Sequence, residues 1–411
     1  MRRRRVLKAT RFFGAGLVSG AADNDPTTVA TLAVIGSTTV YALSWLVVAV
    51  IPMLVVIQTV AANLGVITRE GLEDSVRERY GPGLAIVVLV SVLIVNLITL
   101  AADLEGGSAA LELLTGIDYR WWIVPFAALV LGLLIVGSYK WIERFLRYAA
   151  LLFVTYVAAA FAAHPDWHAV LQATLVPHFD FRPAMVTGAI ALLGTTLTAY
   201  AYVWETIELA EERPPRRGLA LVELDAAVGI FATGIVFWFI LIATAATLGV
   251  HHKPVETAQE AAQALAPLAG RYASILFGVG LLGSAIVAIP VLAGTCAYLV
   301  AEMFGWRRSL TDKFANARPF YTTLIVSVVL GVAISYAGVS PIGLLFFASI
   351  VGGIATPVTL AIMMLLARDR RVMHDHPIPV WLSVAGWIVT LVVTACSAIY
   401  LVQTFTQGGS G

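Results

Sequence analysis

Long apolar runs separated by short polar segments are the dominant feature of this chain. They fall at residues 13–38, 40–65, 84–114, 121–137, 146–163, 184–209, 220–248, 271–303, 319–338, 341–366 and 380–404. A helix needs about 20 apolar residues to cross a bilayer core about 30 Å thick. Only 12% of the residues are charged, against about 25% in soluble domains, and the runs are continuous rather than alternating, unlike barrel strands. The sequence therefore predicts an all-α integral membrane protein with about 11 transmembrane helices.

The basic residues are distributed unevenly between the two sides that these spans define. Only Arg120, Arg182, Lys253 and Arg271 fall in the expected outer loops, and all other Lys and Arg residues fall in the tail 1–12 and in the segments 66–83, 138–147, 210–219, 304–318 and 367–379. Because Lys and Arg accumulate on the cytoplasmic side, we expect a multi-pass protein of a bacterial inner membrane, with its N-terminus in the cytoplasm and its C-terminus outside.

Residues 1–12 are expected to form a cytoplasmic basic tail. The basic start resembles a signal peptide, but acidic residues and a proline interrupt the apolar stretch behind it, so we expect a retained cytoplasmic anchor. Residues 405–411 read as a tail or linker.

The first apolar run is interrupted at its middle by polar residues. They read Ala22-Asp23-Asn24-Asp25-Pro26-Thr27-Thr28. Pro26 removes a backbone donor and breaks the helix, and irregular backbone at membrane depth is tolerated only where it is buried or lines a cavity. A bound cation would satisfy both the carboxylates and the freed carbonyls around Ala22. The plainer alternative is a kink with internally hydrogen-bonded Asp and Thr side chains.

A second interruption lies in the run 184–209, where Gly194, Thr195, Thr196 and Thr198 precede Ala199-Tyr200. This signal is weaker, because Thr can bond back to its own helix. Its position adds weight, since five spans separate the two breaks. Corresponding broken helices in two halves are typical of inverted-repeat transporters. We therefore expect a first repeat over 13–163, a second over 184–366 and an additional span at 380–404.

Other carboxylates lie at or near membrane depth, where ionisable residues are costly. Asp103 follows about 20 apolar-rich residues of the third run. One interpretation is a carboxylate that handles protons or supports the site. The other is a carboxylate that is bonded to a neighbouring helix. Glu105 lies close by. Glu205 follows the second break and either lines an inner vestibule or pairs with nearby arginines.

The residue types that are missing from the breaks limit the class of ion that could bind there. All seven histidines lie in expected loops, and neither break contains Met or Cys. Cys296 and Cys396 lie in apolar runs and form no metal-binding or disulfide pattern. Oxygen ligands alone suit hard cations, whereas sulfur selects softer metals. No basic residue lies inside a span to hold an anion, and no HExxH or nucleophile motif indicates an enzyme.

Three motifs, taken in order, resemble the natural resistance-associated macrophage protein (NRAMP) metal transporters across essentially the whole chain. Asp25-Pro26-Thr27-Thr28 stands where that family has Asp-Pro-Gly-Asn. Ala101-Ala102-Asp103-Leu104 is similar to its Ala-Thr-Asp-Leu. The run from Gly194 to Tyr200 falls where the family has Gly-Ala-Thr-Val-Met-Pro-His. The Ala-Ala-Asp-x-Asp-Pro start at residues 21–26 and the Thr-rich third motif are similar to the NRAMP-related magnesium transporter branch, although that branch usually has Pro at Ala199 and Asp at Asn24.

The resemblance implies a leucine-transporter-like fold with a 5+5 inverted repeat and broken helices 1 and 6. It also implies a metal site formed by Asp25, Thr28 and Thr198 with the carbonyls of Ala22 and Thr195, and with Asp23 or Asn24 nearby. Asp103, Tyr200, Glu105 and Glu205 would form a supporting shell or proton pathway. The family's Met and His are replaced here by Thr198 and Tyr200, which removes a soft ligand and a candidate proton acceptor.

These features predict a secondary transporter of divalent cations, Mg²⁺ and/or Mn²⁺, that works by alternating access with weak or no proton coupling. Mg²⁺ keeps several of its waters, and small Thr side chains would leave room for them. The alternative is a Na⁺- or H⁺-coupled carrier of a small organic solute on the same fold. We expect no enzymatic activity, no cofactor besides the transported cation, no nucleic acid, and a monomer in the lipid bilayer.

Overall fold

The computed structural model describes residues 25–136, 155–212, 219–310 and 314–408, and the elements in these ranges are helical. The first half of the chain contains α3 (Pro26–Thr39), α4 (Ser44–Thr68), α5 (Leu72–Tyr80), α6 (Pro82–Thr115), α7 (Tyr119–Val136) and α9 (Trp167–Leu175). Residues 155–162 are also helical.

The second half repeats the pattern of long helices and short connections. Its helices are α10 (Pro183–Thr196), α11 (Ala199–Glu212), α12 (Leu219–Thr247), α13 (Ala258–Ala262), α14 (Ala266–Ala269), α15 (Ala273–Phe304), α16 (Arg318–Ser335), α17 (Pro341–Arg368) and α18 (Val380–Gly408).

Local sequence explains where many of these helices begin. Helices α3, α6, α10, α16 and α17 each start with a proline in the first turn, a position where the missing N–H costs nothing. Gly81 separates α5 from α6 with a φ of 85°, a conformation that glycine adopts without steric penalty. The apolar composition of the long helices suits the hydrocarbon core of a bilayer.

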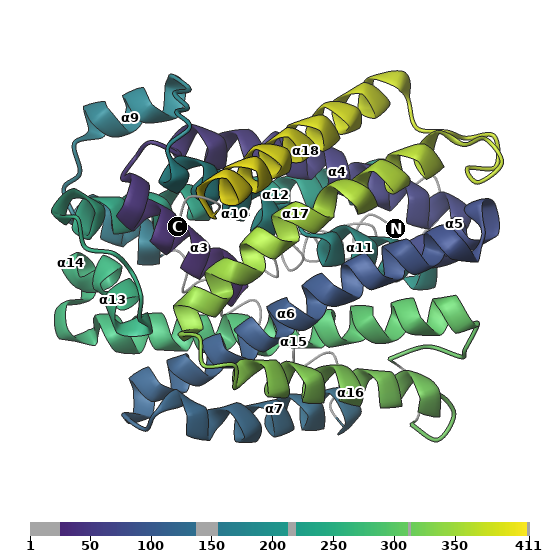
Figure 1. The fold of residues 1–411 in the computed structure, drawn as a ribbon, viewed down its shortest axis with the longest axis horizontal. Helices are drawn as coiled ribbons and strands as arrows, with labels where there is room; N and C mark the ends of the chain where they lie inside the picture. The colour runs from purple at the N-terminus through teal and green to yellow at the C-terminus, as the bar shows by residue number, and fades with distance from the viewer. Residues whose placement is uncertain (1–24, 137–154, 213–218, 311–313, 409–411) are drawn as a thin grey trace, which may run out of the picture.

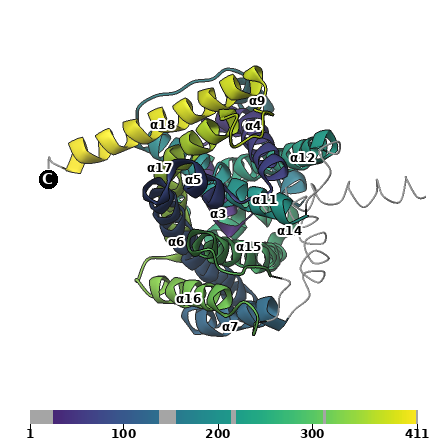
Figure 2. The ribbon, with the colours of Figure 1, turned by 90° about the vertical axis from the view of Figure 1, so that its right-hand side faces the viewer.

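Helix α3 lies inside the bundle, with other helices around it in the view of Figure 2. It contacts α6, α10, α12, α15 and α17, and most of its residues are buried. Helices α6 and α15 make extensive contact and cross in the view of Figure 1, and α16 and α7 also pack against α6. Helix α18 lies at the edge of the bundle against α17 and α10. The break in the first span is therefore placed among five helices instead of in lipid.

The observed helices agree with the expected spans within a few residues. In the described residues, eight helices are long and apolar enough to cross a membrane, and α7 is a shorter apolar helix. Of the expected spans, the first half of 13–38 and part of 146–163 fall outside the described residues. The all-helical prediction is confirmed. Helix α18 continues to Gly408, beyond the expected end at residue 404.

The sequence did not predict the short helices of the connections. Helix α5 lies in the expected cytoplasmic segment 66–83, and α9, α13 and α14 lie in expected outer loops. The charge order of α5 suits a helix, with Glu73 and Asp74 in its first turn and Arg77 and Arg79 in its last. A helix of nine residues is too short to be detected by its hydrophobic periodicity.

Candidate metal site at the helix breaks

Asp25 occupies the N-cap of α3, directly before Pro26. Its backbone is extended, with φ −68° and ψ 163°, and its side chain accepts a hydrogen bond of 2.7 Å from the Thr28 amide. Asp is among the preferred N-cap residues because its carboxylate satisfies a free amide of the first turn. Asp25 is only 2% exposed. The described helix therefore starts at the residue that the sequence singled out as the break.

The second break is present between α10 and α11. Helix α10 ends at Thr196, Leu197 and Thr198 are not helical, and α11 starts at Ala199. The Thr356 hydroxyl of α17 donates to the Leu197 carbonyl at 3.3 Å. The break is thus supported by a neighbouring helix, as buried irregular backbone requires.

The two breaks meet in space although they are far apart in sequence. The Tyr200 hydroxyl, at the start of α11, donates to Oδ2 of Asp25 at 2.8 Å. The hydroxyls of Thr28 and Thr195 share a hydrogen bond of 2.8 Å. These side chains and Thr198 are all buried. The structure therefore gathers Asp25, Thr28, Thr195, Thr198 and Tyr200 at or beside the ends of α3, α10 and α11.

Two further helices fix the start of α3. The Thr27 hydroxyl donates to Oδ1 of Asp103 in α6 at 2.8 Å. The hydroxyls of Thr31 and Ser349 join α3 to α17 at 2.6 Å. Asp103 is fully buried, and its Oδ2 has no hydrogen-bond partner among the described residues. Asp103 is thus bonded to a neighbouring helix, and its second oxygen is still able to bind a proton, so both interpretations of this residue stay open.

The remaining predicted residues lie farther from this cluster or outside the description. Glu105 follows Asp103 by two positions, so it lies about 200° around α6, buried and with no partner for its carboxylate oxygens in the described part. Glu205 is partly buried on α11, five residues after Tyr200. Ala22, Asp23 and Asn24 lie outside the described residues.

Four residues that hold the site together were not identified from the sequence as site residues. They are Thr27, Thr31, Ser349 and Thr356. Thr27 and Thr31 stand four positions apart, the spacing of one helix face, which is a usable signal. Ser349 and Thr356 are small polar residues in a long apolar helix, and nothing local indicates that they face a break.

The arrangement offers oxygen ligands in a strongly shielded place. It combines the Asp25 carboxylate with Thr hydroxyls and with the C-terminal end of α10, where the helix dipole favours a cation. The described residues contain no group of three or more His, Cys, Asp or Glu side chains that could hold a metal ion. A set of one carboxylate and several neutral oxygens suits a hard cation. Such a set is better suited to reversible binding than to holding a metal permanently.

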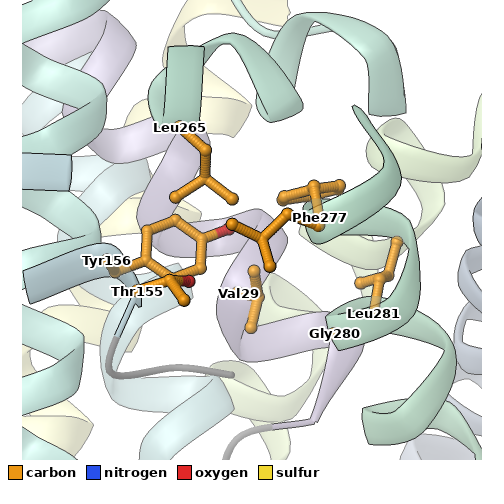
Figure 3. Close-up of a pocket in the computed structure, with 8 residues that line it drawn as sticks. Val29, Thr155, Tyr156, Leu265, Phe277, Gly280 and Leu281 are labelled. Atoms are coloured by element: carbon orange, nitrogen blue, oxygen red, sulfur yellow. The ribbon is translucent and has the colours of Figure 1, made fainter. Parts of the chain in front are cut away.

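A separate pocket beside α3 differs in character (Figure 3). Val29, Tyr156, Leu265, Phe277 and Leu281 line most of it. Its lining residues carry no charge, so it offers little to a cation. The polar cluster at the breaks is the candidate site.

Comparisons with known proteins bear on the family and the fold of the chain. The profile of the family described as "Natural resistance-associated macrophage protein-like" (Nramp) matches residues 16–403. The divalent metal cation transporter MntH of Deinococcus radiodurans is 26% identical over 414 residues, covering 97% of this chain and 91% of that protein. MntH of Bacillus subtilis is 25% identical over 413 residues, covering 96% and 92%.

Solved structures show the same fold. The manganese transporter of Eremococcus coleocola, in complex with an aromatic bis-isothiourea substituted compound, has a TM-score of 0.74 at 19% identity, covering 94% of this chain and 85% of that chain. MhsT in complex with L-phenylalanine has a TM-score of 0.60 at 14% identity, covering 95% and 97%. These likenesses confirm the leucine-transporter-like fold class.

Proposed function

Because the chain belongs to the Nramp family, whose members are transporters and not enzymes, we propose that it carries divalent metal cations across a membrane by alternating access. Mg²⁺ and Mn²⁺ are the proposed substrates. We expect the protein in a bacterial inner membrane, as a monomer, with its N-terminus in the cytoplasm and its C-terminus outside, in line with the positive-inside pattern.

The observation that carries this proposal is the meeting of the two helix breaks around Asp25. Its carboxylate accepts from the Thr28 amide and from the Tyr200 hydroxyl of α11, and the Thr28 hydroxyl is bonded to that of Thr195 in the last turn of α10. All of these ligands are oxygen atoms, and neither Met nor Cys occurs at either break. Hard cations such as Mg²⁺ and Mn²⁺ prefer such ligands. The relatives' names, divalent metal cation transporters, support the same class of substrate.

Weak or absent proton coupling is proposed from the sequence of α6. Residues 82–102, which precede Asp103 in this helix, contain no Asp, Glu, His, Lys or Arg. A proton leaving Asp103 toward the N-terminal end of α6 would find only hydroxyl and amide groups such as Thr99 and Asn96. Tyr200 replaces a more basic imidazole at the site. Both features favour cation movement driven by its own gradient.

A coupled carrier of a small organic solute remains the alternative, because the fold is shared with an amino acid-binding protein and fold alone does not determine function. An amino acid would present its carboxylate to the helix ends. The buried carboxylate of Asp25, which is already at the break, would repel it. This charge argument favours a cation.

The proposal is tested by cation uptake into proteoliposomes, with a Mg²⁺-sensitive dye, a Mn²⁺ quench assay and an internal pH dye. We expect Mg²⁺ and Mn²⁺ entry without acidification, and its loss in Asp25→Ala. Asp166→Ala is the matched control, because Asp166 also caps a helix, α9, but is exposed. Monodisperse wild-type protein that moves no divalent cation would overturn the proposal and favour the organic-solute carrier.

A further inference from the structure

The two carboxylate oxygens of Asp25 are directed toward different donors. Oδ1 accepts from the Thr28 amide at 2.7 Å, and Oδ2 accepts from the Tyr200 hydroxyl at 2.8 Å. The first donor belongs to α3 and the second to α11, on the other side of the second break. Two donors from separate elements therefore fix how the carboxylate is turned.

This orientation limits how the carboxylate can bind an ion. Two-oxygen chelation requires the carboxylate to turn so that both oxygens face the same cation. Donors from two separate helices, one on each oxygen, restrict that rotation, whereas a single oxygen can bind an ion with its remaining lone pair without any rotation. Ca²⁺ takes six to eight oxygen ligands in flexible geometry and often uses both oxygens of a carboxylate. Mg²⁺ demands octahedral geometry at about 2.1 Å and keeps several waters.

We propose that Tyr200 is a specificity-determining residue that holds Asp25 as a one-oxygen ligand and so favours a small, partly hydrated divalent cation over Ca²⁺. The inference rests on the proposed cation transport. It adds the residue that limits the size of the cation that binds. Tyr200 acts on the ion through Asp25, so it is a positioning residue.

The position of Tyr200 is itself firmly set. Its side chain is 5% exposed. Helix α11 packs so closely on α4 that a Cβ added to Gly65 would lie 2.6 Å from the Thr206 carbonyl oxygen. The next tyrosine of the same helix, Tyr202, is 1% exposed. Tyr200 therefore lies on a closely packed helix, with its hydroxyl 2.8 Å from Oδ2 of Asp25.

The test is Tyr200→Phe, which keeps the ring and removes only the donor. We expect Ca²⁺ to compete with Mg²⁺ roughly tenfold better than in the wild type, the scale of a lost hydrogen bond to a charged group. The change should appear in the KM and Kd for Ca²⁺ relative to those for Mg²⁺, measured by uptake and by calorimetry. Tyr202→Phe is the matched control and should leave the preference unchanged.

A second measurement uses the wild type and does not depend on the folding of a variant. The separation of the symmetric and antisymmetric carboxylate stretching bands in difference infrared spectra distinguishes one-oxygen from two-oxygen binding. We expect the one-oxygen signature with Mg²⁺ in the wild type, its absence in Asp25→Asn, and a two-oxygen signature with Ca²⁺ in Tyr200→Phe.

The outcomes separate this inference from the proposed function. A wild type that transports Mg²⁺ but shows two-oxygen binding, or a Tyr200→Phe protein with an unchanged Ca²⁺ preference, would overturn the role of Tyr200 alone. A wild type that binds and moves no divalent cation would overturn the proposed function itself.

Discussion

Thr198 lies in the two-residue break between α10 and α11 and is 5% exposed. Its hydroxyl is a hard ligand, and the members that this chain resembles carry a Met thioether there. A thioether is a soft ligand and favours late transition metals, whereas a hydroxyl oxygen is a hard ligand and gives these metals no such preference. A single side chain at this position can therefore decide between hard and soft cations.

Replacing Thr198 by Met should increase Cd²⁺ uptake relative to Mg²⁺ uptake by roughly tenfold, or about 1.4 kcal/mol, because the site gains sulfur. Competition between Cd²⁺ and Mg²⁺ in proteoliposomes measures the ratio. Thr198→Val is the control that removes the hydroxyl without adding sulfur, and it should not raise Cd²⁺ uptake. An unchanged ratio in Thr198→Met would contradict the argument from ligand softness.

At the scale of elements, the crossing of α10 and α17 stands out because their backbones touch. A Cβ added to Gly194 would lie 2.0 Å from the Ser349 carbonyl oxygen and 2.2 Å from the Gly353 amide nitrogen. A Cβ added to Gly353 would lie 2.5 Å from the Ile190 carbonyl oxygen. The half-helix that ends at the candidate site is therefore packed backbone to backbone against α17.

Gly194→Ala should lower the free energy of unfolding by about 1–3 kcal/mol, the usual cost of overpacking a close-packed interior, because backbone atoms cannot move aside as side chains do. Thermal unfolding of the purified protein in detergent measures the effect. Gly132→Ala is the control, since an added Cβ there meets no atom within 4 Å. Equal unfolding temperatures for the two variants would show that the helices are less tightly packed.

The positions of most helices and of both breaks could be predicted from the sequence. Apolar runs located the spans, and Asp25-Pro26 and the Thr-rich run after Gly194 located both breaks. The bonds between helices could not be predicted, because Thr27 to Asp103 and Thr31 to Ser349 depend on tertiary packing that no local period records. Helix α5 was missed because it is short and mostly polar.

At the scale of the whole molecule, α5 ties together distant ends of the bundle on the side expected to face the cytoplasm. Arg77 donates to the carbonyls of Glu302 and Met303 at the end of α15, at 2.5 and 2.9 Å. Arg79 pairs with Asp369, which follows α17. Glu73 is fully buried in this region, and its carboxylate oxygens have no hydrogen-bond partner among the described residues.

Burial, assisted by the nearby carboxyl groups of Glu302 and Asp74, raises the pKa of Glu73 to about 8 against the opposing effect of Arg77. Between the ordinary glutamate pKa of 4.5 and about 8, the folded protein then holds a proton that the unfolded chain has lost. This contribution to stability is complete below 4.5 and is lost as pH rises through the folded pKa, so the unfolding temperature should fall over this window.

The Glu73→Gln variant should lose this part of the pH dependence, because its amide cannot ionise. Thermal unfolding in detergent between about pH 5 and pH 8 measures the slope, to which one proton contributes about 1.4 kcal/mol per pH unit. Glu78→Gln, at an exposed position of the same helix, should retain the slope of the wild type. A Glu73→Gln protein with the same slope as the wild type would refute the assignment.

The close crossing of α10 and α17 also connects the candidate site to the periphery of the bundle. The Ser397 hydroxyl of α18 donates to the Gly353 carbonyl of α17 at 2.9 Å, next to the contact with Gly194. Helix α18 lies at the edge of the bundle (Figure 2), and its exposed side chains include Trp381, Leu391 and Phe405. The break at the end of α10 is thus only two helix contacts away from the surface that a spanning helix would present to lipid.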